Sequence, residues 1–595
     1  MPVYQAPQRD IRFVVHELLD LPSHYQQLQG CEPLERETLD AIVEEGAKFA
    51  EDVLSPLNPV GDQHGCQWQD NQVSTPPGFA EAYRQFAANG WLALDKDPAY
   101  GGQGLPPSLG SVISELLFSA NHAWTMYGNL SGGAISTLSA HAEETLKQRF
   151  LPPLIEGRWS GTMCLTEAHC GSDLGLLRTR AQPQADGSYT ISGSKMFISA
   201  GEHDLTENIL HLVLARIEGA PAGVKGISLF LVPKIAVNLD GSLGAANGVG
   251  CGSIEHKLGI HGNATCVLNF DNASGYLLGE ANRGLNAMFT FINESRLAVA
   301  QQGQGHAEAA FQGALRYARE RIQMRATPRL RPEQPADPIV AHPDVRRMLL
   351  TQKAYAEGGR MLTYACAQLV DVLHHGASAH DRATAERRLA LLTPIAKGFL
   401  TEAGNEAAQL GIQVFGGHGY IREWGMEQIA RDVRITSIYE GTNSIQGLDL
   451  LTRKVLADNG EALNELLTEI ESFCNSDQAP TALAQPLVRQ IAAWRQVSLW
   501  LSQHQGDDAN LVGASAFDYL MLAGYCLLGY YWLRAAALAE RQLDAGSSER
   551  EFYLGKRETA RFYLQRLLPR ATLHRELIGS GSANLMDIPD AAFAR

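Results

Sequence analysis

The feature that most constrains the fold of this chain is a single block of strand-like sequence, from Gly161 to Asp271, enclosed by helical sequence on both sides. Within the block, β-branched and aromatic runs such as ILHLVLAR and GISLFLVP are separated by turn signals such as Asp186-Gly187. Before it, apolar residues recur at helical spacing from Arg36 to Leu54, and helix-like sequence continues to about Leu154. We therefore expect a mostly α-helical protein with a central β domain.

Helical periodicity returns after the β block. It runs from Asn293 to Gln323, stops in a proline-rich segment that begins at Met324, and resumes from about Asp344 in two long segments. This pattern predicts a helical bundle. Three more helical segments follow a polar, linker-like stretch and predict an added C-terminal helical domain. They lie near residues 487–503, 514–545 and 550–577. The expected domains are an N-terminal segment (1–35), a helical domain (36–160), a β domain (161–279), a helical bundle (280–457) and the added domain (458–595).

Composition narrows the class of protein. The 595 residues are 45% hydrophobic and 19% charged, which is typical of domains with substantial cores and excludes disorder as the main state. With 49 Lys and Arg against 65 Asp and Glu, the formal charge of −16 argues against a protein that coats nucleic acid or anionic lipid with its whole surface. The 9 cysteines are scattered without CxxC or Cys/His ligand spacing, so we expect neither a disulfide framework nor a metal site.

Two segments bear on the location of the protein. The N-terminal sequence mixes acidic with apolar residues and lacks a basic start followed by an apolar run, so we do not expect a secretory signal. The most apolar stretch, from Tyr519 to Leu533, has no charged residue but falls short of the ~20 residues that cross a bilayer. We expect a buried helix there rather than a transmembrane segment. Together with the cysteine usage, these features predict a cytoplasmic protein.

Two strings concentrate polar residues and glycines near domain junctions. The first, MCLTEAHCGSDLGLLRTRA, covers residues 163–181, where a helical domain meets the β domain, and such junctions favour ligand clefts. Its alternative interpretation is a capped turn. The second, FGGHGYIREWGMEQIARDVRITSIYEGTNSIQG, covers residues 415–447. Taken alone, its GGHG fits a helix C-cap and its Glu440 fits a solvated turn acid.

Together and in this order, the two strings resemble the acyl-CoA dehydrogenase family, in its longer bacterial branch with an added C-terminal helical domain. The resemblance extends through nearly the whole chain, including VYQAP near the start and GSANLMDIPDAAF near the end. It implies a helical domain, a β-barrel domain and a four-helix bundle that enclose FAD and an acyl-CoA thioester. It also implies oxidation of a fatty acyl-CoA to the trans-2-enoyl-CoA, as in fatty acid β-oxidation.

The resemblance assigns roles to individual residues. In the β block, one group matches positions that line the flavin ring: Met163, Leu165, Thr166, Ser172, Phe197, Ile198 and Ser199. A second group matches positions that hold the pyrophosphate and adenosine parts of FAD: Arg321, Gln323, Gln413, Gly417, Thr442 and Ser444. The residues expected on the substrate side are Ser172, Asn293, Arg296, Glu440 and Gly441.

Glu440 matches the family's catalytic base. Hydride can leave Cβ of the substrate only as a proton leaves Cα, and a carboxylate in a dry pocket is a suitable base because burial raises its proton affinity. The resemblance places Glu440 on one side of the acyl chain and flavin N5 on the other. It also implies that the thioester oxygen accepts hydrogen bonds from the Glu440 backbone N–H and a ribityl hydroxyl, which stabilises enolate charge.

The chain departs from the common family pattern at three places. TEAHCGSD replaces the usual TEPxAGSD, and its His169 and Cys170 are typical of the longer branch. Asn293 stands where many shorter members have an Asp near the CoA, which puts that substrate contact in doubt. Met324 occupies the place of the usual Phe.

Three alternatives remain beside a fatty acyl-CoA dehydrogenase. An acyl-CoA oxidase shares the flavin site but passes electrons to oxygen, and the branch also includes enzymes that act on methylthiopropionyl-CoA. A third is a DNA-binding relative, because basic residues gather between Arg550 and Arg575. Given the charge of −16, we interpret that segment as a solvated or interface-paired helix face and expect no nucleic acid partner.

The resemblance also implies partners and a substrate size. Electron-transfer flavoprotein is the expected electron acceptor, and a homodimer is expected because the family's counterparts of Arg321 and Gln413 reach the neighbouring subunit's FAD. In the helix that contains YGNLSGGAIS, glycines at 128, 132 and 133 would leave room for a medium to long acyl chain. The alternative is that these glycines serve close helix packing.

Overall fold

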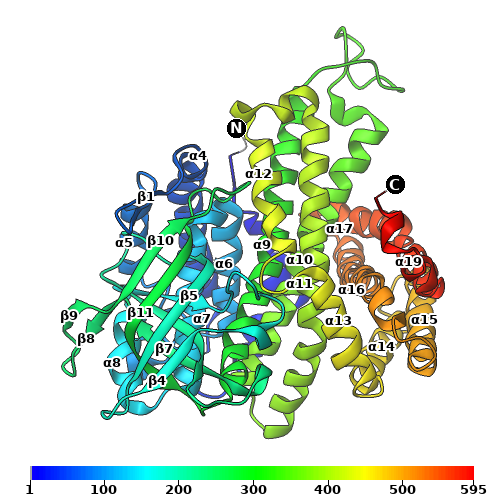
Figure 1. The fold of residues 1–595 in the computed structure, drawn as a ribbon. Coiled ribbons are helices and arrows are strands. Elements are labelled where there is room, and N and C mark those ends of the chain that lie inside the picture. Colours follow the sequence, from blue (N-terminus) through cyan, green and yellow to red (C-terminus); the bar gives the residue numbers. More distant parts are fainter. Residues whose placement is uncertain (1–2, 32, 595) are drawn as a thin grey trace. The chain divides into compact units, whose positions relative to one another are not determined.

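The computed structural model describes residues 3–31 and 33–594. The chain divides into two compact units, which are described separately below (Figure 1). The barrel unit contains Lys48–Gly110 and Ala120–Ala298, and the helical unit contains Met1–Ala47, Ser111–Ser119 and Val299–Arg595.

The barrel unit is built on a seven-stranded sheet. Its strands are β3 (Trp159–Cys164), β4 (Arg180–Pro183), β5 (Tyr189–Ser199), β6 (Asn208–Ile217), β7 (Ile227–Pro233), β10 (Val249–Ile254) and β11 (Thr265–Leu278). Hydrogen bonds connect β11 to β5, β5 to β4, β4 to β6, β6 to β7, and β7 back to β11, so these five strands close into a ring. β3 joins β6 in parallel, and β10 joins β11. The predicted β-barrel domain is confirmed.

Buried apolar side chains pack the inside of the ring. Along β6 and β7 nearly every residue is buried, and one core cluster inside the barrel joins Ile191, Val213, Phe230 and Leu268 with their neighbours. Burial of apolar side chains on this scale is the main stabilising contribution in a domain of this size. Two short hairpins lie outside the ring. They are formed by β1 (Gln67–Gln69) with β2 (Gln72–Ser74) and by β8 (Ile235–Val237) with β9 (Leu243–Ala246).

Helix α7 (His122–His141) is buried along most of its length and packs on β3. A Cβ atom on Gly161 of β3 would lie 2.3 Å from Cβ of Ala134 on α7, so glycine permits this close approach. The other helices of the barrel unit are α4 (Ser55–His64), α5 (Phe79–Ala88) and α8 (Glu144–Ile155), and α6 (Pro107–Ala120) has residues in both units. The predicted helical sequence before the β block is therefore confirmed.

Three long helices form the centre of the helical unit: α9 (Gly284–Glu320), α10 (Pro343–His375) and α11 (Ala379–Phe415). α9 begins in the barrel unit, nine residues before the expected start at Asn293. A Cβ atom at Gly284 would lie 2.3 Å from the carbonyl carbon of Ser228, so the first residue of this helix makes a tight backbone contact that periodicity does not reveal. Ser378 caps α11, since its side chain accepts a hydrogen bond from the Asp381 N–H.

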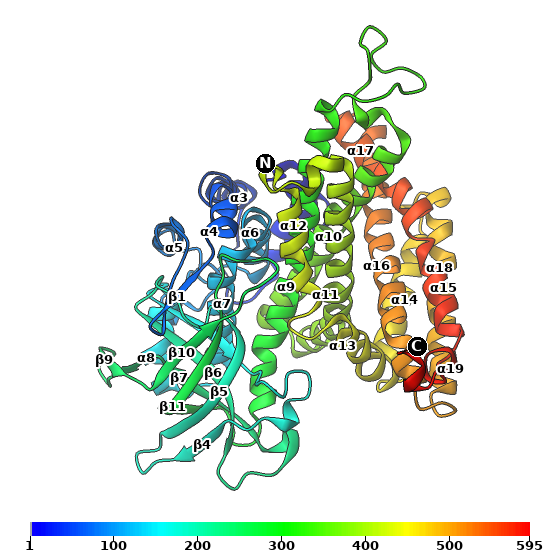
Figure 2. The same ribbon diagram turned by 45° about the horizontal axis from the view of Figure 1, so that its top comes forward.

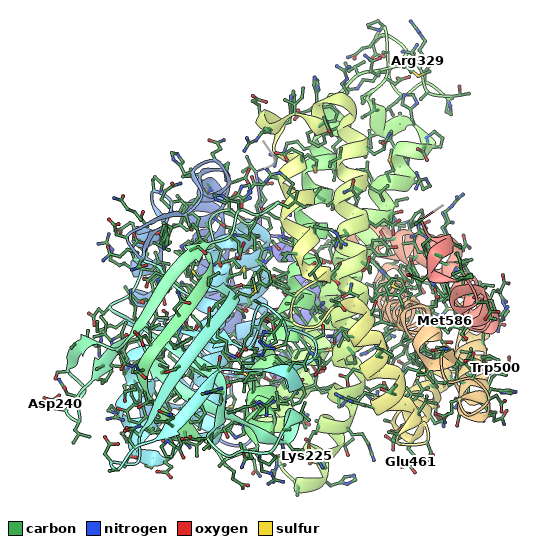
Figure 3. All side chains as sticks on the ribbon, in the orientation of Figure 1. Lys225, Asp240, Arg329, Glu461, Trp500 and Met586 are labelled. Carbon is green, nitrogen blue, oxygen red and sulfur yellow. The ribbon has the colours of Figure 1, made fainter. Side chains whose placement is uncertain are left out.

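Shorter helices complete this part of the unit. They are α1 (Gln8–Arg12), α2 (Leu21–Tyr25), α3 (Arg36–Lys48), α12 (Met426–Val433) and α13 (Asn443–Leu448). The proline-rich segment between α9 and α10 is a loop, as predicted. Arg329 in this loop, labelled in Figure 3, holds Asp337 through an Nε–Oδ2 contact of 2.7 Å.

The added C-terminal domain is helical, as predicted, and its helices are labelled in Figure 2. Its helices are α14 (Glu461–Cys474), α15 (Thr481–His504), α16 (Leu511–Asp544), α17 (Arg550–Phe562), α18 (Arg570–Gly579) and α19 (Ala583–Met586). α14 was not among the three helical segments expected there. Its acidic, amphipathic sequence lies next to the linker-like stretch, which the structure confines to about residues 475–480.

Helix α16 carries the apolar stretch that the sequence analysis identified. Every residue from Tyr519 to Leu533 is buried against the rest of the unit, so the predicted buried helix is confirmed. Among residues 3–31 and 33–594, this is the one helix long and apolar enough to cross a membrane, and 72% of its most apolar window is buried in the protein.

Candidate functional site

In the barrel unit, the predicted flavin residues lie on two segments that are bonded to each other. Met163 is on β3, and Leu165 and Thr166 follow directly after the strand. The backbone N–H of Met196 on β5 donates to the carbonyl of Thr166 at 2.9 Å, and Nζ of Lys195 donates to the carbonyl of Leu165 at 3.0 Å. The end of β3 and the end of β5 are therefore bonded to each other and form one surface.

Phe197 is the most unusual residue on this surface. Its backbone is left-handed, with φ of 60°, and its side chain is 57% exposed. A bulky residue is rarely found in this conformation, which persists only where surrounding contacts enforce it. Its neighbour Ile198 points the other way and is buried in the barrel core. An exposed aromatic ring, presented by a constrained backbone, fits a flat ring system that packs against it.

A buried ion pair supports the turn after β3. Nζ of Lys195 lies 2.9 Å from Oε1 of Glu167, and both side chains are buried. Glu167 also accepts hydrogen bonds from the hydroxyl of Thr179 and the backbone N–H groups of Arg178 and Thr179. Burial raises the pKa of Glu167, but Lys195 and these hydrogen bonds outweigh it and lower the pKa to about 2. This pair was not predicted from the sequence, although a lysine inside a strand pattern was a signal for it.

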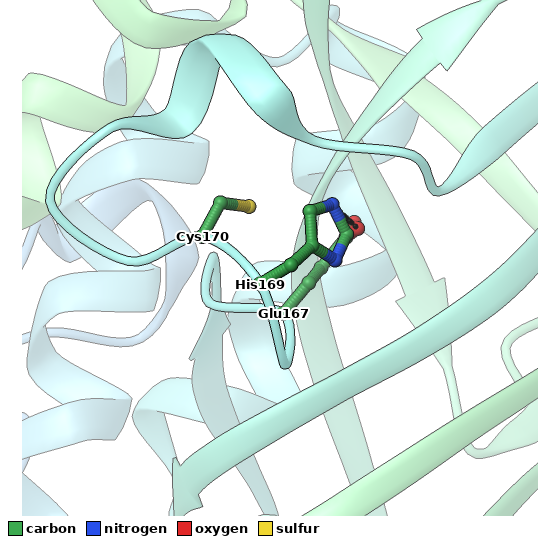
Figure 4. A group of neighbouring side chains, drawn as sticks. All are labelled: Glu167, His169 and Cys170. Carbon is green, nitrogen blue, oxygen red and sulfur yellow. Dashed lines mark ion pairs between the residues drawn. The ribbon is translucent and has the colours of Figure 1, made fainter.

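Glu167, His169 and Cys170 have ligand atoms within 4.8 Å of one another, an arrangement that could hold a metal ion (Figure 4). Their existing contacts do not favour one. The Glu167 carboxylate is engaged by Lys195 and Thr179, and His169 Nε2 lies 2.9 Å from the carbonyl oxygen of Leu176. Burial raises the pKa of the Cys170 thiol, which disfavours the thiolate that a metal requires. We interpret the group as part of a hydrogen-bonded turn.

The remaining predicted residues of the barrel unit lie on the turn and on α9. Ser172 is exposed in the turn that follows Cys170. Asn293 and Arg296 are on α9, where Asn293 is exposed and Arg296 is buried. Ser199 is partly buried at the end of β5, where it pairs with Thr265 of β11.

The glycines of α7 have distinct neighbours. A Cβ atom on Gly133 would lie 2.4 Å from the ring of Phe291, and one on Gly128 would lie 3.1 Å from the ring of Phe86. Close packing therefore accounts for these two glycines, which was the alternative interpretation of the sequence. Gly132 differs, because its Cβ would meet only the carboxylate of Glu294, at 3.3 Å.

In the helical unit, Glu440 lies in a loop of residues 439–443, called the YEG loop below. Glu440 and Gly441 are consecutive left-handed residues, with φ of 57° and 88°. Glu440 is partly buried. The hydroxyl of the preceding Tyr439 donates to Oε1 of Gln302, and the pKa of Tyr439 is raised well above its ordinary value by burial and by the charge of Glu440.

Two side chains hold the backbone of the YEG loop. Nζ of Lys397, a fully buried residue of α11, donates to the carbonyl of Gly441 at 2.8 Å and to Oδ1 of Asn443 at 2.9 Å. Nε2 of Gln446 donates to the carbonyls of Glu440 and Gly441, each at 3.3 Å. Lys397, Asn443 and Gln446 were not predicted from the sequence, since their role depends on contacts between separate helices.

Thr442 and Ser444 follow Glu440 at the start of α13. The hydroxyl of Thr442 caps this helix by accepting from the Ile445 N–H at 3.4 Å, and Ser444 is exposed. Thr442 thus lies within the YEG loop, and Ser444 follows directly after it.

The four other predicted FAD residues gather at one end of the bundle and are exposed: Arg321, Gln323, Gln413 and Gly417. Aromatic contacts bring their two segments together. The ring of Tyr317 on α9 stacks on Phe415 at the end of α11, with centroids 4.2 Å apart, and its hydroxyl lies 2.9 Å from Nδ1 of His418. Large apolar side chains are exposed beside them, including Met324 at 72% and Tyr420 at 85%.

The basic segment from Arg550 to Arg575 is largely paired. Lys556 is buried and contacts the carboxylates of Asp10 and Glu357. Arg570 contacts Glu406 at 2.7 Å, and Arg557 and Arg561 both contact Glu558. These contacts are the arrangement expected for an interface-paired helix face.

Four family models match successive parts of the chain. Three are described as the acyl-CoA dehydrogenase N-terminal domain (residues 36–158), middle domain (162–273) and C-terminal domain (282–455), and the fourth as acetyl-CoA dehydrogenase C-terminal like (466–589). Together they cover most of the chain.

Known proteins are similar to this chain over its whole length. It is 42% identical to the 3-methylmercaptopropionyl-CoA dehydrogenase of Ruegeria pomeroyi, across 98% of this chain and 99% of that protein. It is 34% identical to the broad-specificity linear acyl-CoA dehydrogenase of Mycobacterium tuberculosis, across 100% of both chains. Its fold is similar to that of an acyl-CoA dehydrogenase from Bacillus anthracis solved in complex with FAD, with a TM-score of 0.74, 21% identity, and coverage of 95% of this chain and 91% of that one.

Proposed function

This chain belongs to the acyl-CoA dehydrogenase family, and from that premise we propose that it converts a straight-chain acyl-CoA thioester to the trans-2-enoyl-CoA with Glu440 as the base. The observation that carries the proposal is the YEG loop. A partly buried carboxylate sits on two successive left-handed residues whose carbonyl groups are held by Lys397 and Gln446. Such a constrained backbone costs free energy and is typical of functional sites.

Glu440 would remove the α-proton of the thioester. This proton is weakly acidic until negative charge can spread onto the thioester oxygen, so the base and a hydrogen-bond donor for that oxygen are both needed. We propose the backbone N–H of Glu440 as one such donor. A left-handed turn that is fixed before the substrate binds lets the carboxylate and the N–H act without reorganisation.

FAD is the cofactor of this family, and the barrel unit carries residues that fit it. Bound FAD supplies the oxidant that takes up the hydride from Cβ. The exposed ring of Phe197 offers an apolar face to a flat ring system, and Met163 and Thr166 lie on the segment bonded to it. In the helical unit, Thr442, Ser444, Arg321, Gln323, Gln413 and Gly417 are proposed to bind the pyrophosphate and adenosine parts.

The substrate is proposed to be a thioester with a straight, medium to long acyl chain. Of the three glycines on α7, Gly132 alone supports this chain length, because close packing accounts for the other two. A second candidate is 3-methylmercaptopropionyl-CoA, because the relative at 42% identity carries that name. This acyl group is pentanoyl with sulfur in place of one methylene. Comparison of pentanoyl-CoA with 3-methylmercaptopropionyl-CoA therefore tests recognition of the sulfur at constant chain length.

Three further features belong to the proposal. Electrons would pass to an electron-transfer flavoprotein rather than to oxygen, the reaction would serve fatty acid β-oxidation in the cytoplasm, and the enzyme would be a homodimer. The exposed apolar side chains beside Arg321 and Gln413 support the dimer, since such patches mark interaction sites.

Replacement of Glu440 by Gln tests the central assignment. Glutamine keeps the shape of the side chain but cannot accept a proton, and loss of a general base slows reactions about 10²- to 10⁴-fold. Stopped-flow bleaching of the flavin band by pentanoyl-, octanoyl- and 3-methylmercaptopropionyl-CoA measures the step directly. A rate for E440Q within tenfold of the parent would mean that the base lies elsewhere. Parallel turnover with a dye acceptor and with oxygen distinguishes a dehydrogenase from an oxidase.

A further inference from the structure

Lys397 holds a buried positive charge against the YEG loop. Its side chain is fully buried in α11, and its ammonium group donates to the Gly441 carbonyl at 2.8 Å and to Asn443 Oδ1 at 2.9 Å. Burial of an ammonium group is costly unless hydrogen bonds compensate for lost water. This charge contacts the loop one residue from Glu440. A helix that only packed against the loop would need an apolar side chain there and no charge.

Asn443 connects the loop to α11 in the other direction. Its Nδ2 donates to Oγ1 of Thr401 at 2.9 Å and to Oε1 of Glu402 at 2.6 Å, and both residues lie one turn beyond Lys397. One amide side chain of the loop therefore has three partners on a single face of α11. This network fixes the position of the loop along the helix as well as its distance from it.

Helix α16 of the added domain packs on both elements that make this contact. A Cβ atom on Gly447 of α13 would lie 2.5 Å from the carbonyl oxygen of Ala516 on α16. A Cβ atom on Gly398, the residue after Lys397, would lie 2.5 Å from Cδ1 of Leu520. At Gly447 the two backbones approach as closely as glycine permits, and at Gly398 the Leu520 side chain occupies the space that a Cβ would need, so α16 packs against both α11 and α13.

We propose that Lys397 is a positioning residue for the base. Through Gly441 and Asn443 it fixes the left-handed backbone that presents the Glu440 carboxylate, and α16 keeps α11 and α13 at the spacing at which Lys397 reaches the loop. The inference rests on the proposed role of Glu440. It gives the added domain a part in catalysis through the support of the YEG loop.

The test compares K397M with wild type and with T393V in the full-length, FAD-loaded protein. Methionine has nearly the same length but no donor. Thr393 is a matched control, because it is buried one turn earlier on α11 and donates only to the Leu389 carbonyl, at 2.7 Å. Stopped-flow flavin bleaching over a range of concentrations of a straight-chain acyl-CoA that reduces the wild-type flavin gives a limiting rate and a half-saturating concentration.

We expect K397M to lower the limiting rate per bound flavin at least tenfold, with a half-saturating concentration within threefold of wild type. T393V should stay within twofold of wild type in both quantities. A purely structural role for Lys397 would lower protein yield or flavin content but leave the rate per bound flavin unchanged. A limiting rate for K397M within twofold of wild type would overturn the inference.

Two further variants keep the test decisive. If K397M does not fold, N443A takes its place. It removes one of the two acceptors of Lys397 and the two hydrogen bonds that Asn443 donates to α11, and it is subject to the same thresholds. E440Q is measured alongside. A wild-type rate for E440Q would refute the proposed function itself, whereas a slow E440Q with a K397M or N443A rate near wild type would refute only the positioning role.

Discussion

Lys195 and Glu167 form an ion pair, with 2.9 Å between Nζ and Oε1, that also holds the backbone beside the predicted flavin residues. The same ammonium group donates to the Leu165 carbonyl at 3.0 Å. Both charges are buried, so the pair is stabilising only while both partners are ionised. This property makes the turn after β3 sensitive to acid.

The stability of the barrel unit should fall as Glu167 becomes protonated. The pKa of Glu167 is lowered to about 2, below the ordinary value of 4.5, so its contribution is present above pH 4.5 and is lost as the pH falls toward 2. E167Q leaves Lys195 buried without its counter-charge and should be destabilised by roughly 3 to 5 kcal/mol at pH 7. Thermal unfolding at several pH values measures both effects.

A surface variant separates this effect from general acid sensitivity. Glu81 is exposed and pairs with Arg84 at 2.6 Å, so E81Q should change stability by no more than about 0.5 kcal/mol. Between pH 5 and 3, the melting temperature of wild type and E81Q should fall more steeply than that of E167Q. Parallel curves for all three proteins would contradict the assignment.

Phe197 should contribute to FAD binding and little to folding. Its ring is 57% exposed, so F197A loses little burial, whereas aromatic contacts contribute about 0.5 to 1.5 kcal/mol beyond the buried area. We expect FAD affinity to fall about tenfold while the melting temperature of the flavin-free protein stays near that of wild type. Ile198 is the matched contrast. It is buried in the barrel core, so I198A should lower stability by about 2 to 5 kcal/mol. Equal FAD affinity for wild type and F197A would contradict the role of the ring.

Local sequence pattern could predict much of this fold. Helical periodicity located α10 and α11, alternation and turn signals located the strands, and the apolar run from Tyr519 to Leu533 identified a buried helix. Glu440 was indicated by a resemblance that rests on short strings, the YEG string among them. Each of these features depends on residues that are close in the chain.

Contacts between distant residues were not predictable in the same way. The pairing of β7 with β11 closes the barrel, and Lys556 contacts Asp10 across more than 500 residues. The three partners of the Asn443 side chain all lie on α11, and the packing of α11 against the YEG loop has no periodic signal in the sequence. The sequence could therefore indicate Glu440 as the proposed base, whereas the network around it required the structure.

The bundle end that carries Arg321 and Gln413 should form the subunit interface. Tyr420 is 85% exposed there, and Met324 is 72% exposed. Introduction of charge with Y420D should shift light-scattering mass toward the monomer and lower FAD content, because a buried unpaired charge is costly in an interface. Leu239 is a suitable control, since it is 94% exposed on a loop of the barrel unit. A mass for Y420D equal to that of wild type and L239D would argue against this face as the interface.

Gly132 is the position from which acyl chain length can be tested. Gly133 is unsuitable, because even an alanine there would place Cβ 2.4 Å from the ring of Phe291 and should destabilise the barrel unit. At Gly132 a Cβ atom meets only the Glu294 carboxylate, at 3.3 Å, which is the end of a flexible side chain.

If α7 lines the end of the acyl pocket at this point, G132L should fill the space that a long chain needs. The ratio of flavin reduction rates with octanoyl-CoA and pentanoyl-CoA should then fall at least tenfold, while the pentanoyl-CoA rate changes less than threefold. One methylene in an apolar pocket contributes about 1 to 3 kcal/mol to discrimination, so loss of room for three of them is sufficient for this change. An unchanged ratio in a folded, FAD-loaded G132L would show that Gly132, like Gly133, serves helix packing and that chain length is determined at another position.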